Sequence, residues 1–261
     1  MSKISVYTTC TNAIRDEYFL IEGIKSALLF ADEVVVLDCG STDDTIEQVE
    51  AIGDSRIKIY HQDWLPSIGW AMYKIAKSVA LGRCTSEWCV LMDADEVFHE
   101  KDVDRIRNLP NEAEEDIIAI AFGTYHFYKD YKHLLNGYEG WKDLYEIKVR
   151  MVRNGLGIHH GNQGGDIDAL LDRHGKPIPD DKIKFVNVPV YHYGHVRSDS
   201  AYLRKQNKMH SFYEGKDIKK DSMEWISLEK LSIFNGTHPD VMRIRIAVGT
   251  DNHNKIIQLY K

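Results

Sequence analysis

The segment from Trp88 to Phe98 joins a short apolar run to a cluster of carboxylates. Val90 to Met92 are apolar, and Asp93, Asp95 and Glu96 follow them. A short apolar run bounded by polar residues is typical of a buried strand in a parallel sheet. The carboxylates then lie at the edge where open α/β sheets bind ligands. Clustered carboxylates repel one another unless a cation or a proton neutralises them, and oxygen ligands suit a hard divalent ion. A solvated acidic turn is the alternative.

Segments typical of strands and helices alternate before this point. Strand-like runs cover residues 4–8, 34–37 and 56–60, and helix-period apolar stripes cover residues 19–28 and 46–52. The alternation indicates an α/β fold with a Rossmann-like, mainly parallel sheet and helices on both faces. Neither Gly-x-Gly-x-x-Gly nor Gly-x-x-x-x-Gly-Lys-Ser/Thr occurs in the chain. The acidic residues with a metal are therefore the expected means of holding phosphates.

The same patterns predict the rest of the chain. We expect helices at residues 70–81, 102–109 and 200–213, the second stopped by Pro110 and followed by an acidic loop, and strands at residues 116–124, 147–152 and 184–190. Residues 125–145 are rich in Tyr, His, Trp and Gly, which suits either a surface that stacks on a ring-shaped ligand or a well-packed irregular loop. Residues 154–165 are rich in glycine and lack a regular pattern, so we expect a flexible loop that closes over a site.

Composition narrows the class of protein. The 261 residues carry a net charge of −7, which disfavours a general electrostatic grip on nucleic acid or anionic membrane. The apolar runs are too short to cross a bilayer, and the start of the chain has no signal-peptide pattern. The four cysteines form no Cys-x-x-Cys pair, so we expect reduced, mostly buried thiols and a cytoplasmic location.

Two motifs together resemble the family 2 glycosyltransferases of the GT-A fold. The first is Val34 to Thr45, which contains Asp-Cys-Gly-Ser-Thr-Asp, and the second is Leu91 to Glu96, which contains Asp-Ala-Asp. Thr8 to Asn12 resembles a diverged form of the Thr-x-x-Asn that ends the family's first strand, without its proline. The resemblance covers residues 4–100 best, and it returns faintly at residues 191–197 and 234–239.

The resemblance implies a domain organisation and an activity. Residues 1–198 are expected to form a GT-A catalytic domain, with residues 1–100 as the nucleotide-sugar half and residues 101–198 as the acceptor half. Residues 199–261 are expected to be a C-terminal extension packed on this core. The implied reaction is metal-dependent transfer of a sugar, with inversion, from a nucleoside-diphosphate sugar to a hydroxyl. The default donor is a UDP-sugar, and the acceptor is a glycan, a lipid-linked sugar or a small molecule.

The resemblance also assigns roles in the donor site. Asp38 matches the residue that contacts the nucleobase, and the neighbouring polar residues that lie beside the nucleoside are Thr8, Asn12 and Ser41. The residues that hold the ribose and, through Mn2+ or Mg2+, the diphosphate are Asp93, Ala94 and Asp95. The metal stabilises the charge of the leaving group as a Lewis acid.

Further candidates come from later in the chain. His192 matches a histidine that completes the metal shell, with His195 as the substitute and a packed core histidine as the alternative. Cationic side chains that add to charge stabilisation are Arg150, Arg153 and Arg197, unless they are surface or structural charges. Glu96 is expected to orient the metal-binding turn or to cap the next helix.

Inversion also needs a carboxylate that accepts the proton of the acceptor hydroxyl. The candidates for this base are Asp166 and Asp168, which follow the glycine-rich loop. The alternative is that both are acidic residues of a loop without a catalytic role. Asp143 and Glu146 compete with them. The Glu-Asp or His-Glu pair of many relatives is missing.

Other classes of protein fit parts of the sequence. Asp93-Ala-Asp-Glu-Val97 matches the Asp-x-Asp-x-Val of haloacid-dehalogenase-like phosphotransferases, in which the first Asp is the nucleophile. That motif belongs on a first strand, whereas a complete α/β half precedes it here. A nucleotidyltransferase needs a basic, glycine-rich loop that residues 8–15 do not supply. A carbohydrate-binding module without catalysis needs no acidic strand end.

Overall fold

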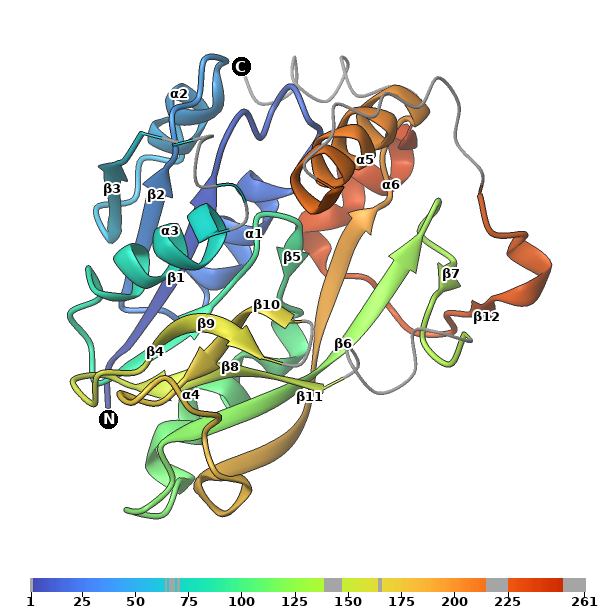
Figure 1. Ribbon diagram of the computed structural model, residues 1–261. Helices are drawn as coiled ribbons and strands as arrows, with labels where there is room; N and C mark the ends of the chain where they lie inside the picture. The colour runs from blue at the N-terminus through green and yellow to red at the C-terminus, as the bar shows by residue number, and fades with distance from the viewer. Residues whose placement is uncertain are drawn as a thin grey trace.

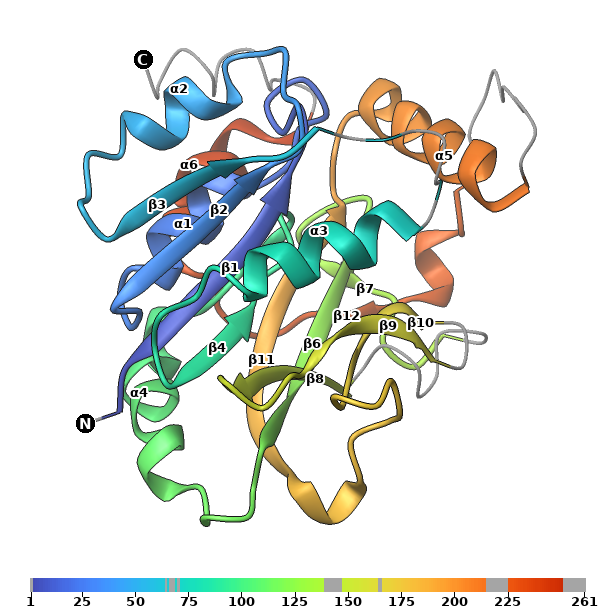
Figure 2. The same cartoon turned by 60° about the vertical axis from the view of Figure 1, so that its left-hand side comes forward.

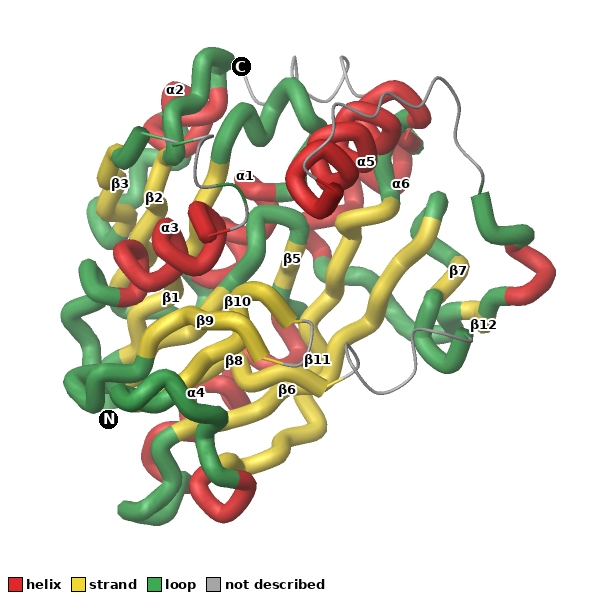
Figure 3. Tube along the Cα trace, viewed as in Figure 1, coloured by secondary structure: helices red, strands yellow, loops and turns green. Residues whose placement is uncertain are grey.

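The main feature of the molecule is one large mixed sheet with helices on both faces (Figures 1 and 3). The computed structural model describes residues 2–63, 65, 69, 71–138, 147–163, 166–214 and 225–250. Within them the sheet has ten strands, eight of which follow the order β12-β7-β6-β8-β4-β1-β2-β3, while β11 pairs with β5 and β6. The predicted α/β class with a Rossmann-like, mainly parallel sheet is therefore confirmed.

The first half of the sheet is parallel. Its strands are β1 (Ile4–Cys10), β2 (Glu33–Asp38), β3 (Ile57–His61) and β4 (Trp88–Leu91). Strand β1 lies between β2 and β4 and is parallel to both. The connecting helices are α1 (Leu20–Ala27), α2 (Thr45–Glu50) and α3 (Ala71–Leu81). Because β1, β2 and β4 run in the same direction, their C-terminal residues meet at one edge of the sheet.

The second half of the sheet contains antiparallel pairs. Its strands are β5 (Glu96–Val97), β6 (Ala119–Tyr128), β7 (His133–Leu134), β8 (Ile147–Arg153) and β11 (Ile183–His195). Strand β8 runs antiparallel to both β4 and β6, and β11 runs parallel to β6. Helix α4 (Val103–Glu112) connects β5 to β6, and β9 (His159–Gln163) with β10 (Asp166–Leu171) forms a separate two-stranded sheet.

The C-terminal part supplies the remaining elements. Helix α5 (Asp199–Glu214) follows β11, strand β12 (Ser232–Ile233) pairs with β7, and α6 (Arg243–Val248) follows. Short 3₁₀ helices occupy Glu100–Asp102, Asp180–Lys182, Leu228–Lys230 and Asp240–Met242. Arg245 of α6 donates from Nε to the Glu22 carboxylate of α1 at 2.6 Å, and both side chains are buried. No helix in the described ranges combines the length and the apolar character needed to span a bilayer.

Alternation along the parallel strands divides the core into two layers. Even-numbered residues such as Val34 and Val36 pack with α1 and α4, whereas odd-numbered residues such as Val35 and Leu37 pack with α3 and with Leu170 of β10. Figure 2 shows α3 on the side of the sheet opposite α1. Successive side chains of a strand point to opposite faces, so a strand covered on both sides is apolar throughout. The four cysteines are free and buried, as expected.

Three segments differ from the sequence-based prediction. Helix α4 continues through Pro110 to Glu112, so the helix is not stopped there and the acidic loop begins later. Pro110 stands in the last turn, where a missing N–H removes only one helical bond, and its ring is buried beside Leu109.

The second difference concerns the glycine-rich segment. Part of it, His159–Gln163, is strand β9, which pairs with β10. The segment is therefore not a structureless closing loop, because the ladder with β10 and the Tyr7 hydroxyl at 2.8 Å from His160 Nε2 fix it. Strand β6 also extends through Tyr125 to Tyr128, so the start of the aromatic segment is regular, buried sheet.

Helix α1 approaches the residues after β4 so closely that Gly23 has no room for a side chain. A Cβ on Gly23 would lie 2.6 Å from the Glu96 carbonyl oxygen and 3.2 Å from Met92 Cε. We expect Gly23→Ala to lower the free energy of unfolding by about 1–2 kcal/mol, because overpacking outweighs the gain in helix propensity. Urea unfolding measures this. Gly82→Ala is the matched control, since its Cβ meets nothing closer than 3.4 Å. Unchanged stability of Gly23→Ala would contradict the packing described.

Candidate active site

Asp38 ends β2 with its carboxylate folded back toward its own loop. The Ser41 N–H donates to both carboxylate oxygens, at 3.1 and 3.2 Å, and Asp38 is 4% exposed. Gly40 has φ +83°, a conformation that side chains rarely adopt, so the turn needs glycine there. We call residues 38–44 the Asp38 loop. Its bonds leave the carboxylate fixed at the C-terminal edge of the sheet.

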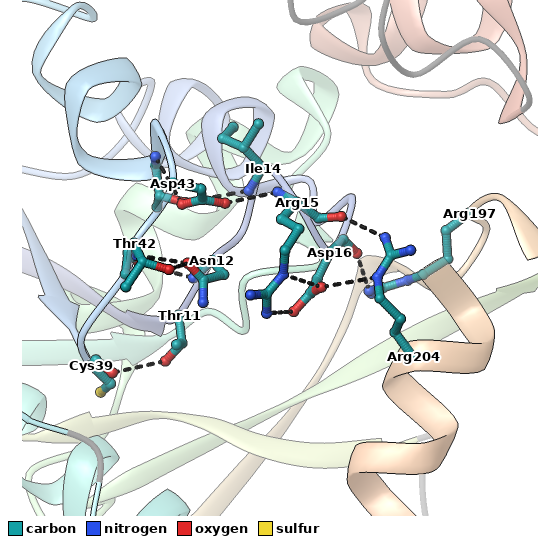
Figure 4. Close-up of polar contacts among 12 residues, drawn as sticks. Thr11, Asn12, Ile14, Arg15, Asp16, Cys39, Thr42, Asp43, Arg197 and Arg204 are labelled. Carbon is teal, nitrogen blue, oxygen red and sulfur yellow. Dashed lines mark hydrogen bonds and ion pairs between the residues drawn. The ribbon is translucent and has the colours of Figure 1, made fainter. Parts of the chain in front are cut away.

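A second loop, residues 11–19 between β1 and α1, is bonded to the Asp38 loop (Figure 4). The Asn12 N–H donates to Ser41 Oγ at 2.8 Å, and the Thr42 N–H donates to Asn12 Oδ1 at 2.7 Å. Asn12 adopts a left-handed φ of +50°, which asparagine tolerates better than most residues. Thr8 lies on β1 beside Val36, fully buried, with no hydrogen-bond partner for its Oγ1 among the described residues. The structure thus brings together Asn12, Asp38 and Ser41, while Thr8 lies beside Val36, two residues before Asp38.

The chain after β4 forms a closed turn, residues 93–96, which we call the acidic turn. The Asp93 N–H donates to a Glu96 carboxylate oxygen at 2.8 Å, and the Glu96 N–H donates to the Asp93 carbonyl at 3.0 Å. Ala94, at 9% exposed, points into the core cluster between the two aspartates. Glu96 bonds the turn itself and does not cap the following helix, in agreement with the first of its two expected roles.

Two cations hold Asp93. Lys77 Nζ of α3 lies 2.5 Å from Asp93 Oδ1, and an Arg150 guanidinium nitrogen of β8 lies 3.3 Å from Oδ2. The same guanidinium also bonds the Glu96 carboxylate. Lys77, Arg150 and Glu96 are all buried. A buried carboxylate without a cation is costly, so these pairs offset the cost of placing the carboxylates of the acidic turn there.

Three groups face the Asp95 carboxylate. Oδ2 accepts from Arg197 at 3.0 Å and from Lys205 Nζ at 3.1 Å, and Oδ1 lies 3.5 Å from His192 Nε2. Burial alone would raise the pKa of Asp95, but Lys205, His192 and Arg197 together hold it well below its usual range. Asp95 is therefore ionised at neutral pH.

His192 belongs to a partly buried group of imidazoles. Its Nδ1 lies 3.1 Å from His126 Nδ1, on the neighbouring strand β6, and the His195 Nδ1 lies 3.0 Å from the Tyr202 hydroxyl. Burial lowers the pKa of His192 to about 3 and also lowers that of His195, although Asp95 opposes both shifts. Both imidazoles are neutral at pH 7, which is the form that binds metals.

The loop between β1 and α1 is also bonded to the start of α5 (Figure 4). Arg197 donates to the Asp16 carbonyl at 2.7 Å, and Arg204 donates to the Arg15 carbonyl at 2.7 Å. The Glu17 carboxylate accepts from the N–H of Ser198 at 2.8 Å and from its hydroxyl at 2.6 Å. Residues near position 16 therefore join α5 to the loop that carries Asn12.

The structure thus places two clusters on the acidic turn, Asp93 with Arg150, and Asp95 with His192 and Arg197. Arg153 is separate, because its guanidinium bonds the Ile117 carbonyl and lies over the Trp88 ring.

The candidate bases are placed less completely. Asp166 and Asp168 lie on β10, and their side chains are outside the described part of the structure. Asp143 and Glu146 lie outside the described residues altogether.

Sequence reasoning missed the two lysines. The helical period placed Lys77 on α3, and its proximity to Asp93 depends on tertiary packing. Lys205 lies 110 residues from Asp95 in sequence, and no local pattern connects the two. The only available signal was a lysine among the apolar positions of each predicted helix.

A divalent ion requires oxygen or imidazole ligands with open positions for a substrate. Asp95 and His192 supply a carboxylate and a neutral imidazole that face each other, which fits a partial set completed by phosphate oxygens. Both Asp93 oxygens already contact cations. Among the described residues no group of three or more His, Cys, Asp and Glu side chains has a metal-holding arrangement. Asp95 and His192 fit the ion, and Asp93 as a third ligand stays a prediction.

The neutral histidines predict a pH dependence of stability. The unfolded chain takes up a proton at His192 below its ordinary pKa of about 6.5, whereas the folded protein does so only near pH 3. Stability therefore falls as the pH drops from about 6.5, by up to about 1.4 kcal/mol per pH unit for this histidine. Urea unfolding at pH 7 and pH 5 measures the loss. His192→Gln should reduce it, whereas His174→Gln, at an exposed position, should not. An equal loss in both variants would contradict the assignment.

Comparison with known proteins agrees with this geometry. The family model described as glycosyl transferase family 2 matches residues 5–167. An uncharacterized glycosyltransferase of Rickettsia typhi is 32% identical over 106 residues, which are 41% of this chain and 32% of the relative. The SPbeta prophage-derived glycosyltransferase SunS of Bacillus subtilis is 25% identical over 200 residues, which are 76% of this chain and 39% of SunS. The chain thus matches about a third of the length of these curated relatives.

A solved structure supports the fold. The crystal structure of S. aureus TarS 1–349 superposes with a TM-score of 0.51 and 17% identity, covering 82% of this chain and 73% of that chain. The likeness shows a GT-A fold. Since the family model spans more than half of the sequence, the chain belongs to glycosyl transferase family 2.

Proposed function

We propose that this protein transfers a sugar from a nucleoside-diphosphate sugar to a hydroxyl acceptor, with inversion and with the help of Mn2+ or Mg2+. One observation carries the proposal. Asp38 ends β2 and the acidic turn follows β4, on either side of β1, at the same edge of the sheet. Neighbouring strands lie about 4.8 Å apart, so the two sites are about 10 Å apart. A nucleoside diphosphate spans such a distance.

Asp38 binds the nucleobase in this proposal. A buried carboxylate that is fixed by the Ser41 N–H accepts readily from a ring N–H. Uracil offers that donor, so UDP is the default nucleotide, while guanine and thymine offer one as well. Thr8, Asn12 and Ser41 lie beside the nucleoside. The unpartnered hydroxyl of Thr8 supports a ligand near the end of β1.

The acidic turn binds the ribose and the diphosphate. Asp95 and His192 would hold the metal, which supplies positive charge to the diphosphate when bound. Asp93 and Ala94 shape the turn, and Arg150 fixes it by holding Asp93 and Glu96 together. Arg197 fixes Asp95 from its other side.

Transfer breaks the bond between the sugar's anomeric carbon and the β-phosphate oxygen, and the electron pair stays on that oxygen. The acceptor hydroxyl oxygen forms the new bond from the opposite face, and its proton passes to a carboxylate base. We assign the base to Asp166 or Asp168 because β10 packs on α3, whose Lys77 contacts the acidic turn. The acceptor class remains a glycan, a lipid-linked sugar or a small molecule.

The rival functions have less support. The family match favours glycosyl transfer over the phosphotransferase and nucleotidyltransferase alternatives. The acidic motif also follows the fourth strand, whereas the phosphotransferase motif belongs on the first.

Removing either aspartate of the motif should abolish Mn2+-dependent donor binding. We expect Asp93→Ala and Asp95→Ala to weaken binding of UDP-sugars in the presence of Mn2+ at least about 100-fold, which corresponds to about 2.7 kcal/mol. Titration calorimetry measures the affinity. Asp95→Asn keeps the side-chain shape, and Asp180→Ala, at an exposed position, is the control. Donor binding and hydrolysis like wild type in either alanine variant would refute the role of the turn.

Loss of the base should separate binding from transfer. We expect Asp166→Asn or Asp168→Asn to leave donor affinity within about twofold and to lower the transfer rate about 100-fold or more, the scale of general base catalysis. A donor panel with UDP-, GDP- and dTDP-sugars and a hydroxyl acceptor measures both quantities. Unchanged transfer in both variants would remove these residues as base candidates.

A further inference from the structure

The acidic turn and the cations that contact it together carry more positive than negative charge. Its carboxylates are Asp93, Asp95 and Glu96, and the cations in contact with them are Lys77, Arg150, Arg197 and Lys205. Over these contacts among the described residues, four positive charges stand against three negative ones. The turn is therefore poised to receive an anion, even before any divalent ion is added.

Arg197 is not free to serve that anion. Its side chain is 0% exposed, it donates to the Asp16 carbonyl as well as to Asp95, and its guanidinium lies 4.1 Å from the centre of the Tyr18 ring. These contacts fix the guanidinium. Its single positive charge is enough to balance the single negative charge of Asp95. The charge of Lys205 is then the surplus at this carboxylate.

Lys205 differs from Arg197 in access and in hydrogen bonding. Its side chain is 17% exposed, and the oxygen acceptors of its ammonium among the described groups are Asp95 Oδ2 and the Gly194 carbonyl, both at 3.1 Å, while the Tyr18 ring centre lies 5.7 Å away. An ammonium has three N–H donors, so one remains for a further acceptor. Lysine binds phosphate as a point charge on a flexible stem. Lys205 therefore has the charge, the donor and the freedom that a phosphate oxygen requires.

Helix α5 also places a second lysine toward the other end of the site. Lys208 follows Lys205 by one helical turn, and its charge opposes the rise that burial causes in the pKa of the Cys39 thiol, directly after Asp38. The bonds of Ser198, Arg197 and Arg204 to residues 15–17 hold α5 in this position. Helix α5 is thus held against the loop of residues 11–19, which is itself bonded to the Asp38 loop.

We propose that Lys205 is a diphosphate-binding residue, whose ammonium contacts a phosphate oxygen of the donor while Arg197 remains as the partner of Asp95. The inference rests on the proposed function and adds a binding residue to it. During transfer the same ammonium stabilises the negative charge that grows on the β-phosphate as the bond to the sugar breaks.

The test compares a nucleoside with its diphosphate. Calorimetry measures the affinity of the full chain for UDP, GDP and dTDP and for their nucleosides, with and without Mn2+. Lys205→Met should weaken binding of the diphosphate that wild type prefers about tenfold or more, the scale of a hydrogen bond between charged groups. Binding of the matching nucleoside should change less than about twofold. Lys205→Arg keeps the charge and should retain most of the affinity.

The controls separate the alternatives. Lys230→Met makes the same substitution at an exposed position and should bind like wild type. Lys205→Gln replaces Lys205→Met if the latter does not fold, and retained nucleoside binding reports a folded site.

Three results would overturn the inference. The first is unchanged diphosphate binding in both the Met and the Gln variant, and the second is an equal loss for nucleoside and diphosphate. The third is tighter binding of Mn2+ alone with unchanged binding of the diphosphate, which would make Lys205 a competitor of the metal. If wild type binds none of the three diphosphates, the proposed function fails and this inference fails with it.

Discussion

Charge compensation at the acidic turn is the constraint on which the rest of the structure depends. Buried carboxylates cost several kcal/mol each when they lack a partner. Their partners here come from α3, from β8, from the segment between β11 and α5, and from α5 itself. Each of these elements must therefore contact the acidic turn, which follows β4. This requirement places both halves of the sheet and helix α5 around that turn. Because Gly23 has no side chain, α1 can pack closely against Met92 and Glu96 of the same region.

The second constraint is the continuity between the two ends of the site. Asn12 joins the loop after β1 to the Asp38 loop, and Asp16 joins it to Arg197, which bonds Asp95. The Glu17 carboxylate accepts a hydrogen bond from the N–H of Ser198, the residue directly before α5. A change at the Asp38 loop is thus connected to the acidic turn through hydrogen bonds alone. Such a chain keeps two half-sites in register, as a ligand that spans both requires.

The sequence predicted much of the fold because local patterns determine it. The apolar runs ending at Asp38 and at Met92 are buried strands, and the polar residues after them meet at one edge. Prediction from the sequence failed where tertiary contacts determine the local structure. Pro110 stays within α4 because its ring packs in the core, and His159–Gln163 becomes a strand because β10 pairs with it. Neither Lys77 nor Lys205 could be linked to an aspartate, since both contacts join residues distant in sequence.

The same division holds for the residues of the site. Asp38, Asp93 and Asp95 stand in motifs with fixed local spacing, so their grouping was predictable. His192 reaches Asp95 only because β11 pairs with β5 beside the acidic turn, and the resemblance to a family suggested it where no local pattern did.

The central claim is that one edge of the sheet binds a nucleoside diphosphate from Asp38 to Asp95. A crystal structure of the protein with UDP and Mn2+, with the manganese located by anomalous scattering, tests it most directly. The account predicts a manganese peak between Asp95, His192 and the diphosphate, with the nucleobase of UDP beside Asp38. A nucleotide bound at another surface, or a manganese ion away from Asp95, would contradict it.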